Sequence, residues 1–431
     1  MIAEFKIQNY LSVKSEQILS FEPTTDTLMK DEYTVEVKDN VRLLKTGLIY
    51  GANASGKTNL LQALSFFREL ITDNPKDKTQ KLKVIPFLLN DSSKNESTVF
   101  TLSFYAEKEK YVLMLRVDAN RIYEETLTCY PGAQPAKLYS RTYNPYTDAT
   151  EIEFGNKLGI SKKNQQIISG NTINNCSVLA AFGKSNVELS RLNVVYNYFA
   201  HQMGSMLKPN DSLLTYVKNS LSEDTDGQLK EFLTDMLKAS DFNITGLHLR
   251  KEEEDISPAI EKMIVSSDLP AYITQNMLRQ GKITNYELQF KHSVNGEEYE
   301  LPENLESRGT IRFMGMVVLL KQLLFDNKII VIDEVETSLH YELLAYFLKV
   351  FLANSTQNSQ LIMTTHDINL LNESFVRRDT IWFADKDKCG ETKLVRLSSL
   401  GLHKNLSPYN AYKQGKLIDL PFFESIYIKH K

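Results

Sequence analysis

The sequence predicts an α/β protein, and three stretches of its 431 residues carry this prediction. The first is an apolar strand, a glycine-rich turn and a helix in direct succession over residues 43–70. The second and third are short apolar runs near residues 330 and 362, each of which ends in polar side chains. After residue 309 the pattern alternates helix, strand, helix and strand, which is typical of an α/β core.

The glycine-rich turn has the pattern of a phosphate-binding loop. Residues 50–64 read YGANASGKTNLLQAL, and Gly51–Thr58 fits G-x-x-x-x-G-K-[ST]. The apolar GLIY before the turn predicts a buried strand, and the apolar positions after it have helical spacing. Because a helix N-terminus attracts anions, this context favours a nucleotide site over a chance match. The predicted phosphate-binding residues are Asn53, Ala54, Ser55, Gly56, Lys57 and Thr58.

The apolar run Ile329–Ile332 predicts a buried strand that delivers Asp333 and Glu334 to its C-terminal end. A carboxylate at Asp333 can hold Mg²⁺ together with the hydroxyl of Thr58. The next carboxylate, Glu334, can orient and deprotonate an attacking water molecule. Buried strands end in acids for other reasons too, but the phosphate loop in the same chain favours the catalytic interpretation.

The third stretch, QLIMTTHDINLL, predicts an apolar strand that ends at Thr364, Thr365 and His366. A neutral imidazole at this place can bind the γ-phosphate or the attacking water and so detect the phosphate. A lone histidine at a strand end is more often structural. The order of the motifs along the chain makes the functional interpretation of His366 the stronger one.

Ser307 and Gly309 open a predicted helix shortly before the Asp333 strand. A serine hydroxyl and a glycine N–H at a helix N-terminus form a second anion site. Such a site is useful if it closes on the nucleotide of a second subunit. The ordinary alternative is a helix N-cap.

The remaining chain predicts two insertions and therefore four parts. Alternating apolar residues from Thr98 to about Phe154 predict antiparallel strands, and residues from about 185 to 281 show mainly helical spacing. Asn295-Gly296 suits the type I′ turn of a hairpin. The predicted parts are residues 1–95 (first part of the α/β core), 96–180 (β subdomain), 181–283 (helical insertion) and 284–431 (second part of the core).

Bulk composition excludes several classes of protein. A net charge of −4 gives no general attraction to nucleic acid, although the basic run at 76–83 leaves a local contact open. Three scattered cysteines favour neither a disulfide framework nor a zinc site, which fits a reducing cytoplasm. No stretch approaches the roughly 20 apolar residues of a membrane span, and the start has no leader pattern. We therefore predict a cytoplasmic protein without a membrane partner.

The order of these motifs resembles the ABC-type ATPase heads, in which two heads enclose two ATP molecules. The segments NYLSVKSEQILSF, GANASGKTNLLQAL, PFLLND, LESRGT, DEVETSLH, TTHD and RRDTIWFADKD are similar to the stand-alone ABC-type defence ATPases of the RloA/AbiLi kind. That family is related to the OLD ATPases and to the ATPase subunit of the PARIS anti-phage system. The resemblance implies an α/β fold, an ABC-type P-loop ATPase head with an inserted antiparallel β subdomain and a helical insertion.

The resemblance also implies site roles, with ATP and Mg²⁺ as cofactors. Lys57 and Thr58 would bind phosphate and metal, and Asp333 and Glu334 would be the metal ligand and catalytic base. Ser307 and Gly309 would form the signature contact to the partner's ATP, and His366 the switch. Two departures from the family stand out. PFLLND offers only Asn90 or Asp91 where a Q-loop glutamine is expected, and the C-terminal QGKLIDLP is poor in glycine.

The implied function is that of a regulatory ATPase in anti-phage defence by abortive infection. ATP would close a homodimer or larger assembly that holds or releases a separately encoded effector, often a Toprim-type nuclease. A phage protein is a candidate trigger. The acids after His366 show no metal-site pattern, so nuclease activity is expected in a partner chain.

Two other functions compete with this interpretation. The main alternative is a DNA-repair or SMC-like head that acts directly on nucleic acid. Such heads usually carry a long coiled coil, for which the helical insertion is too short. An ABC transporter subunit is disfavoured by the 250 residues between Lys57 and Ser307 and by the missing membrane domain. For Arg377 and Arg378 we expect a solvated pair, with an interface role as the weaker alternative.

Overall fold

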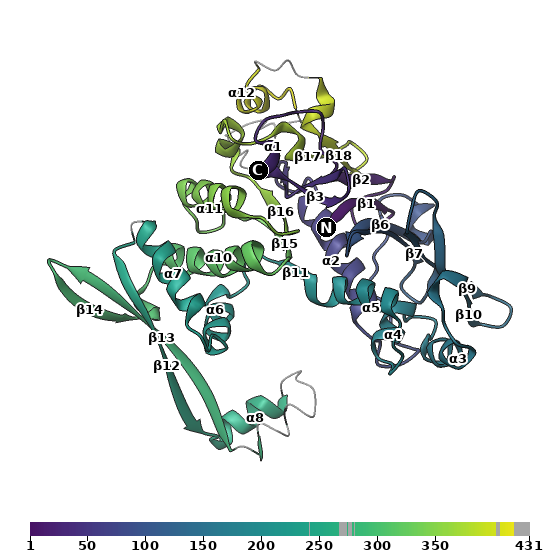
Figure 1. The fold of residues 1–431 in the computed structure, drawn as a ribbon, viewed down its shortest axis with the longest axis horizontal. Helices are drawn as coiled ribbons and strands as arrows, with labels where there is room; N and C mark the ends of the chain where they lie inside the picture. Colours follow the sequence, from purple (N-terminus) through teal and green to yellow (C-terminus); the bar gives the residue numbers. More distant parts are fainter. Residues whose placement is uncertain (241, 267–273, 275–277, 280, 402–405, 418–431) are drawn as a thin grey trace, which may run out of the picture. The chain divides into compact units, whose positions relative to one another are not determined.

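The computed structural model describes residues 1–431 apart from 241, 267–273, 275–277, 280, 402–405 and 418–431 (Figure 1). The described residues form two compact units. The first unit holds residues 1–209, 322–337 and 344–431, and the second holds 210–321 and 338–343. The C-terminal segment QGKLIDLP lies outside the described residues from position 418 onwards. The predicted four-part division stays a prediction.

A six-stranded sheet forms the centre of the first unit and confirms the predicted α/β fold class of a P-loop ATPase. Its order is β11 (Met203–Leu207), β15 (Ile329–Ile332), β16 (Gln360–Thr365), β5 (Thr46–Tyr50), β17 (Ile381–Lys386) and β18 (Thr392–Arg396). All neighbours pair in parallel except β17 and β18. Every residue of β5, β15 and β16 is buried, as the continuous apolar runs of a doubly covered parallel sheet require.

The predicted antiparallel strands form a second sheet of the first unit, but they do not stand alone. The order is β10 (Ala149–Phe154), β9 (Ala136–Asn144), β8 (Ile122–Tyr130), β7 (Glu109–Val117), β6 (Thr98–Ala106), β1 (Ile2–Gln8) and β2 (Gln17–Ser20). The N-terminal strand β1 pairs with β6, a contact across about a hundred residues that strand periodicity cannot reveal. The ring of Phe5 on β1 lies 5.7 Å from that of Phe67. This contact packs the sheet against α2 (Lys57–Thr72), the helix that follows the phosphate loop.

Helical segments follow in the first unit, and here the sequence-based expectation needs a correction. The helices are α3 (Lys162–Asn171), α4 (Val178–Gly183) and α5 (Ser190–Asn197). Part of the segment predicted as helical insertion, residues 203–207, is instead strand β11 of the central sheet. This strand is only five residues long and gains its conformation from pairing with β15, so no local pattern marks it.

The second unit combines helices with a three-stranded antiparallel sheet. It contains α6 (Leu213–Ser222), α7 (Gln228–Ala239), β12 (Ile244–Asp255), α8 (Pro258–Ser266), β13 (Lys282–Val294) and β14 (Glu297–Pro302). Within the segment whose spacing predicted helices, residues Gln228–Ala239 form α7, as expected. The predicted turn is confirmed as well, since Asn295 and Gly296 join β13 to β14 with φ values of 54° and 87°.

Strand β12 corrects the helical expectation for residues 244–255. It pairs with β13 from Ile244–His292 to Asp255–Lys282, and Figure 1 shows the two strands as a long ribbon. The second half of β12 reads RKEEED and lacks the alternating apolar residues of a typical strand. Its strand conformation therefore comes from pairing with β13.

The other elements complete the two units. A short helix α1 (Lys30–Tyr33) precedes the small sheet of β3 (Thr34–Lys38) and β4 (Val41–Leu44), and α12 (Pro408–Lys413) lies near the C-terminus. Helices α10 (Arg308–Phe325) and α11 (Tyr341–Asn354) flank β15 in the chain. Among the residues that the structure describes, every helix is too short or too polar to cross a membrane.

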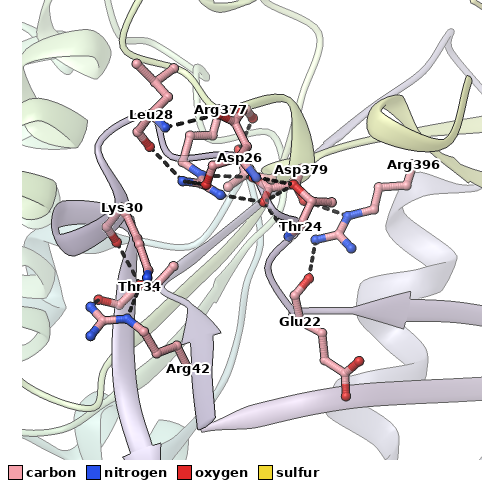
Figure 2. A network of polar contacts seen from close by, with 11 residues as sticks. Glu22, Thr24, Asp26, Leu28, Lys30, Thr34, Arg42, Arg377, Asp379 and Arg396 are labelled. Atoms are coloured by element: carbon pink, nitrogen blue, oxygen red, sulfur yellow. Dashed lines mark hydrogen bonds and ion pairs between the residues drawn. The ribbon is translucent and has the colours of Figure 1, made fainter. Parts of the chain in front are cut away.

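Arg377 and Asp379 form a buried ion pair beside β17, which corrects the expectation of a solvated or interface arginine (Figure 2). Neither side chain is exposed, and two hydrogen bonds of 3.0 and 2.7 Å join them. Arg377 also donates to the backbone carbonyls of Asp26 and Leu28, at 3.0 and 2.6 Å. The pair therefore fastens the 24–28 loop to the central sheet, a contact between segments about 350 residues apart.

Candidate functional site

The phosphate loop joins β5 to α2, as predicted, and its two glycines fit places where a side chain would collide. A Cβ at Gly51 would overlap the carbonyl oxygen of Ala384, and one at Gly56 would overlap the hydroxyl of Thr392. Gly56 also has a φ of 98° and is the N-cap of α2. Ala54 has a left-handed φ of 63°. The loop therefore keeps a tight path that ends at the helix N-terminus, an arrangement suited to phosphate.

Residues distant in the sequence support this loop. The hydroxyl of Thr392 donates to the Ser55 carbonyl at 2.8 Å and lies 2.8 Å from the Ser12 hydroxyl. Asn59 on α2 donates to the same Ser12 hydroxyl at 2.7 Å. The sequence interpretation missed Ser12 and Thr392, because only the tertiary structure brings the N-terminal segment and β18 to the loop.

Lys57 is almost fully buried at the start of α2. Its ammonium donates to the carbonyls of Gly51 and Ala52 at 2.9 and 3.0 Å. Burial lowers the pKa of this ammonium, and three carboxylates act against that effect, those of Glu336, Asp333 and Glu334. The site thus places one lysine charge among several acids, where it can bind phosphate oxygens.

Thr58 and Asp333 lie in direct contact, although 275 residues separate them. The Thr58 hydroxyl donates to Asp333 Oδ2 at 2.9 Å, and the Thr364 hydroxyl donates to Oδ1 at 2.6 Å. Asp333 is 4% exposed. A hydroxyl and a carboxylate are the hard oxygen ligands that Mg²⁺ takes beside water and substrate phosphates. Within the described ranges no group of three or more His, Cys, Asp or Glu residues could hold a metal ion.

Glu334 and His366 also lie close to each other, at the ends of β15 and β16. His366 Nε2 is 4.0 Å from Glu334 Oε1, and both side chains are partly exposed. Glu334 has a left-handed φ of 45°, and its N–H donates to the Thr364 hydroxyl at 2.8 Å. A non-glycine residue in this conformation is strained, and such strain clusters at functional sites. The carboxylate and the imidazole can act on the same water or phosphate.

A third acid, Glu336, belongs to the same group and was missed by the sequence interpretation. Its Oε1 accepts the backbone N–H of His366 at 2.6 Å. Its Oε2 is buried and has no hydrogen-bond partner among the residues that the structure describes. The only sequence signal was the last residue of DEVE, an acid two positions after Glu334.

Ser307 and Gly309 lie at the N-terminus of α10 in the second unit. The Ser307 hydroxyl accepts the Thr310 N–H at 3.0 Å, which is the N-cap contact of the ordinary interpretation. A Cβ at Gly309 would come within 3.2 Å of the Ser338 carbonyl oxygen. The serine and the glycine are thus brought together at one helix end, and their contact with nucleotide stays a prediction.

Two acids fasten the segment before Ser307 to its own unit. Glu303 accepts the Leu288 N–H and pairs with Lys218, each at 2.8 Å. Glu306 lies 2.6 Å from His292 Nε2 on β13. These contacts fix the start of α10 against β13 and α6.

The two candidates for the Q-loop are engaged in local contacts. The Asn90 side chain accepts the N–H groups of Ser92 and Ser93 at 3.1 and 3.2 Å, as in a turn. Asp91 pairs with Lys94 at 2.9 Å. The Q-loop ligand therefore stays unassigned.

Comparison with known proteins gives one family and several matching solved structures. The family model described as "AAA domain, putative AbiEii toxin, Type IV TA system" matches residues 48–165 and 194–372. Among solved structures, the SMC head domain from Thermotoga maritima is 12% identical and covers 92% of this chain and 98% of its own, with a TM-score of 0.43. The SmcHead bound to the C-winged helix domain of ScpA is 10% identical, with coverages of 96% and 99% and a TM-score of 0.46. The Smc head domain with an extended coiled coil, bound to the C-terminal domain of ScpA derived from Pyrococcus furiosus, has the same identity and TM-score, with coverages of 96% and 98%. A search of curated proteins found no match.

Proposed function

The chain belongs to the family described as "AAA domain, putative AbiEii toxin, Type IV TA system", and on that premise we propose that it binds and hydrolyses ATP. The observation that carries the proposal is the hydrogen bond from the Thr58 hydroxyl, at the start of α2, to the Asp333 carboxylate. The Thr364 hydroxyl donates to the same carboxylate. A buried carboxylate beside a phosphate-loop hydroxyl can bind a Mg²⁺ ion that also contacts the phosphates of a nucleotide.

Each residue of the site has a defined part in this proposal. The N–H groups of residues 53–58 and the Lys57 ammonium bind the β- and γ-phosphates. Thr58 and Asp333 would hold Mg²⁺, which when bound neutralises charge on the phosphate oxygens. Glu334 orients the attacking water and takes its proton, and His366 hydrogen-bonds the γ-phosphate. The 4.0 Å between the Glu334 and His366 side chains lets both reach the same reacting group.

A second copy of the chain would complete the site through Ser307 and Gly309. The serine hydroxyl and the N-terminal N–H groups of α10 form an anion site at the end of an 18-residue helix. One chain holds a single phosphate-loop motif, so this second anion site is best used on the nucleotide of a partner. ATP would then hold a homodimer together, alone or as the building block of a larger assembly.

The biological role that we propose is a regulatory ATPase in anti-phage defence by abortive infection. The family description names a "Type IV TA system", and we propose that this chain likewise acts beside a second gene product. The ATP-closed assembly would hold or release a separately encoded effector, of which a Toprim-type nuclease is the leading candidate. A phage protein would trigger the change.

Ser307→Arg is expected to block dimer formation by ATP while leaving ATP binding by the monomer intact. The long cationic side chain would occupy the place of the partner's phosphates. The assay is light scattering after size exclusion with ATP and Mg²⁺, in a Glu334→Gln background that preserves the nucleotide. Ser161→Arg is the matched control, since Ser161 caps α3 in the same way and its loss costs about 1 kcal/mol. An ATP-dependent dimer of the Ser307 variant would exclude the contact in trans.

Native mass spectrometry tests the regulatory role. Tagged Glu334→Gln protein, expressed with its flanking genes and purified with ATP and Mg²⁺, is expected to form an even-numbered assembly that carries a second gene product. Lys57→Ala, which lacks the phosphate-binding ammonium, should not form this assembly when it is prepared in the same way. A monomer without a partner, or an assembly that carries DNA alone, would contradict the proposed role and support an SMC-like head.

A further inference from the structure

Glu336 is the one acid of the site that the proposed mechanism does not use. It lies in the turn after β15, and this turn is bonded to the end of β16 at successive residues. The N–H of Glu334 donates to the Thr364 hydroxyl at 2.8 Å, and the N–H of Val335 donates to the Thr364 carbonyl at 3.1 Å. The Glu336 carboxylate then accepts the N–H of His366 at 2.6 Å. The contact to His366 is thus the last of three that align the two strand ends.

The contact is well suited to hold His366 in place. The bond is charge-assisted and short, and such bonds are about twice as strong as neutral ones. It acts on the backbone, so it places the residue without using either nitrogen of the imidazole. The Nε2 atom of the ring lies 4.0 Å from Glu334 Oε1.

The second oxygen of the Glu336 carboxylate, Oε2, indicates a further contact. Oε2 is buried without a hydrogen-bond partner among the described residues, and an unsatisfied buried acceptor is costly. The Lys57 ammonium is already bonded to two loop carbonyls. A donor that comes with the nucleotide, such as a water molecule beside the phosphates, would satisfy this oxygen.

We infer that Glu336 is a positioning residue, whose Oε1 holds His366 at the γ-phosphate and whose Oε2 accepts a hydrogen bond from water beside the phosphates. The inference rests on the proposed ATPase function and extends it. Its first consequence concerns nucleotide preference. His366 can recognise ATP over ADP only if it is held at the γ-phosphate, so the preference should depend on Glu336.

The test compares two substitutions that separate the two oxygens. Glu336→Gln keeps a carbonyl oxygen for the His366 N–H but replaces Oε2 with an N–H₂ donor, whereas Glu336→Ala removes both contacts. In the Glu334→Gln background, dissociation constants are measured for ATP and for ADP, each with Mg²⁺. We expect Glu336→Ala to lower the preference for ATP by about tenfold, equal to about 1.4 kcal/mol, and Glu336→Gln to keep it. In the otherwise unchanged chain, Glu336→Gln should lower kcat without raising KM.

Double substitution identifies the route of the effect. If Glu336 acts through His366, Glu336→Ala should add nothing to the loss of ATP preference caused by His366→Ala. Glu109→Ala is the matched control for folding, because Glu109 is also a partly buried acid, and its Oε1 has no hydrogen-bond partner among the described residues. It should leave nucleotide preference unchanged.

The outcomes separate the inference from the function on which it rests. If the protein without substitutions binds neither ATP nor ADP, the proposed ATPase function itself is wrong. A protein that prefers ATP and keeps this preference in Glu336→Ala would overturn the positioning role alone. Additive losses in the double variant would equally overturn it. An unchanged kcat in Glu336→Gln would overturn the contact of Oε2 with water.

Discussion

Glu334→Gln is expected to bind ATP as the unchanged protein does and to hydrolyse it roughly 10²–10⁴-fold more slowly, the usual contribution of a general base. The substitution keeps the shape of the side chain and removes its ability to accept a proton. The residues proposed to bind phosphate and metal are Lys57, Thr58 and Asp333, and their contacts remain in place. Binding and turnover should therefore separate.

The measurement is phosphate release under steady state together with a dissociation constant for ATP. Glu36→Gln, at an exposed acid of β3, is the matched control and should hydrolyse ATP at the normal rate. Lys57→Ala is the opposite case, since it should lose ATP binding itself. A Glu334→Gln protein with normal turnover would place the base elsewhere, and Glu336 would be the next candidate.

Arg377→Met is expected to lower the free energy of unfolding of the first unit by about 3–5 kcal/mol at pH 7. It removes one partner of a fully buried ion pair and leaves the Asp379 carboxylate uncompensated. It also removes the donors to the Asp26 and Leu28 carbonyls, which tie the 24–28 loop to the sheet (Figure 2). Both losses act at the same place.

Urea unfolding can be followed there directly, because the chain has a single tryptophan and this residue, Trp382, lies near the pair. Its ring lies 5.4 Å from the guanidinium of Arg396, which donates to the Asp379 carbonyl. Arg378→Met is a control with a smaller expected effect, since Arg378 is only partly buried. The double variant Arg377→Met, Asp379→Leu should recover much of the lost stability, because it removes the unpaired charge as well. A change within about 0.5 kcal/mol for Arg377→Met would contradict the structural role.

The loss of unfolding free energy caused by Arg377→Met should also depend on pH. Burial raises the pKa of Asp379, but the hydrogen bonds from Arg377 and Thr24 outweigh it, so the folded pKa is lowered. In the unchanged protein this group therefore stabilises the fold above the ordinary aspartate pKa of about 3.9, and the contribution is lost as pH falls through the folded pKa. Without Arg377, burial dominates and the folded pKa is raised. The destabilisation by Arg377→Met should thus be smaller at pH 4 than at pH 7.

The phosphate loop and the apolar strands could be predicted from sequence because each is specified locally. The glycines at 51 and 56, Lys57 and the apolar residues of α2 lie within one turn and helix, and their spacing is enough. The same holds for Asp333 and Glu334 directly after four apolar residues, and for the Asn295-Gly296 turn. In each case neighbouring residues set the backbone conformation, through strand or helix periodicity or through a required left-handed φ.

Other features depend on pairing between distant segments, and no local pattern encodes them. Strand β12 is highly charged and becomes a strand only because β13 lies beside it. The pairing of β1 with β6 makes the N-terminal strand part of the antiparallel sheet. Arg377 looks like a surface residue in the sequence and is buried, because Asp379 and the loop at residues 24–28 satisfy its donors.

The sequence alone determined the kinds of chemical group in this protein: a phosphate loop, a pair of acids after a buried strand, and a histidine after another. Only the tertiary structure decided how they meet. It placed the Thr58 hydroxyl on Asp333, bonded Glu336 to His366, and brought Ser12 and Thr392 to the loop. The physical reason is that hydrogen bonds and ion pairs act over about 3 Å, whatever the separation along the chain. Parallel strands bring distant residues to that distance by aligning their C-terminal ends at one edge of the sheet.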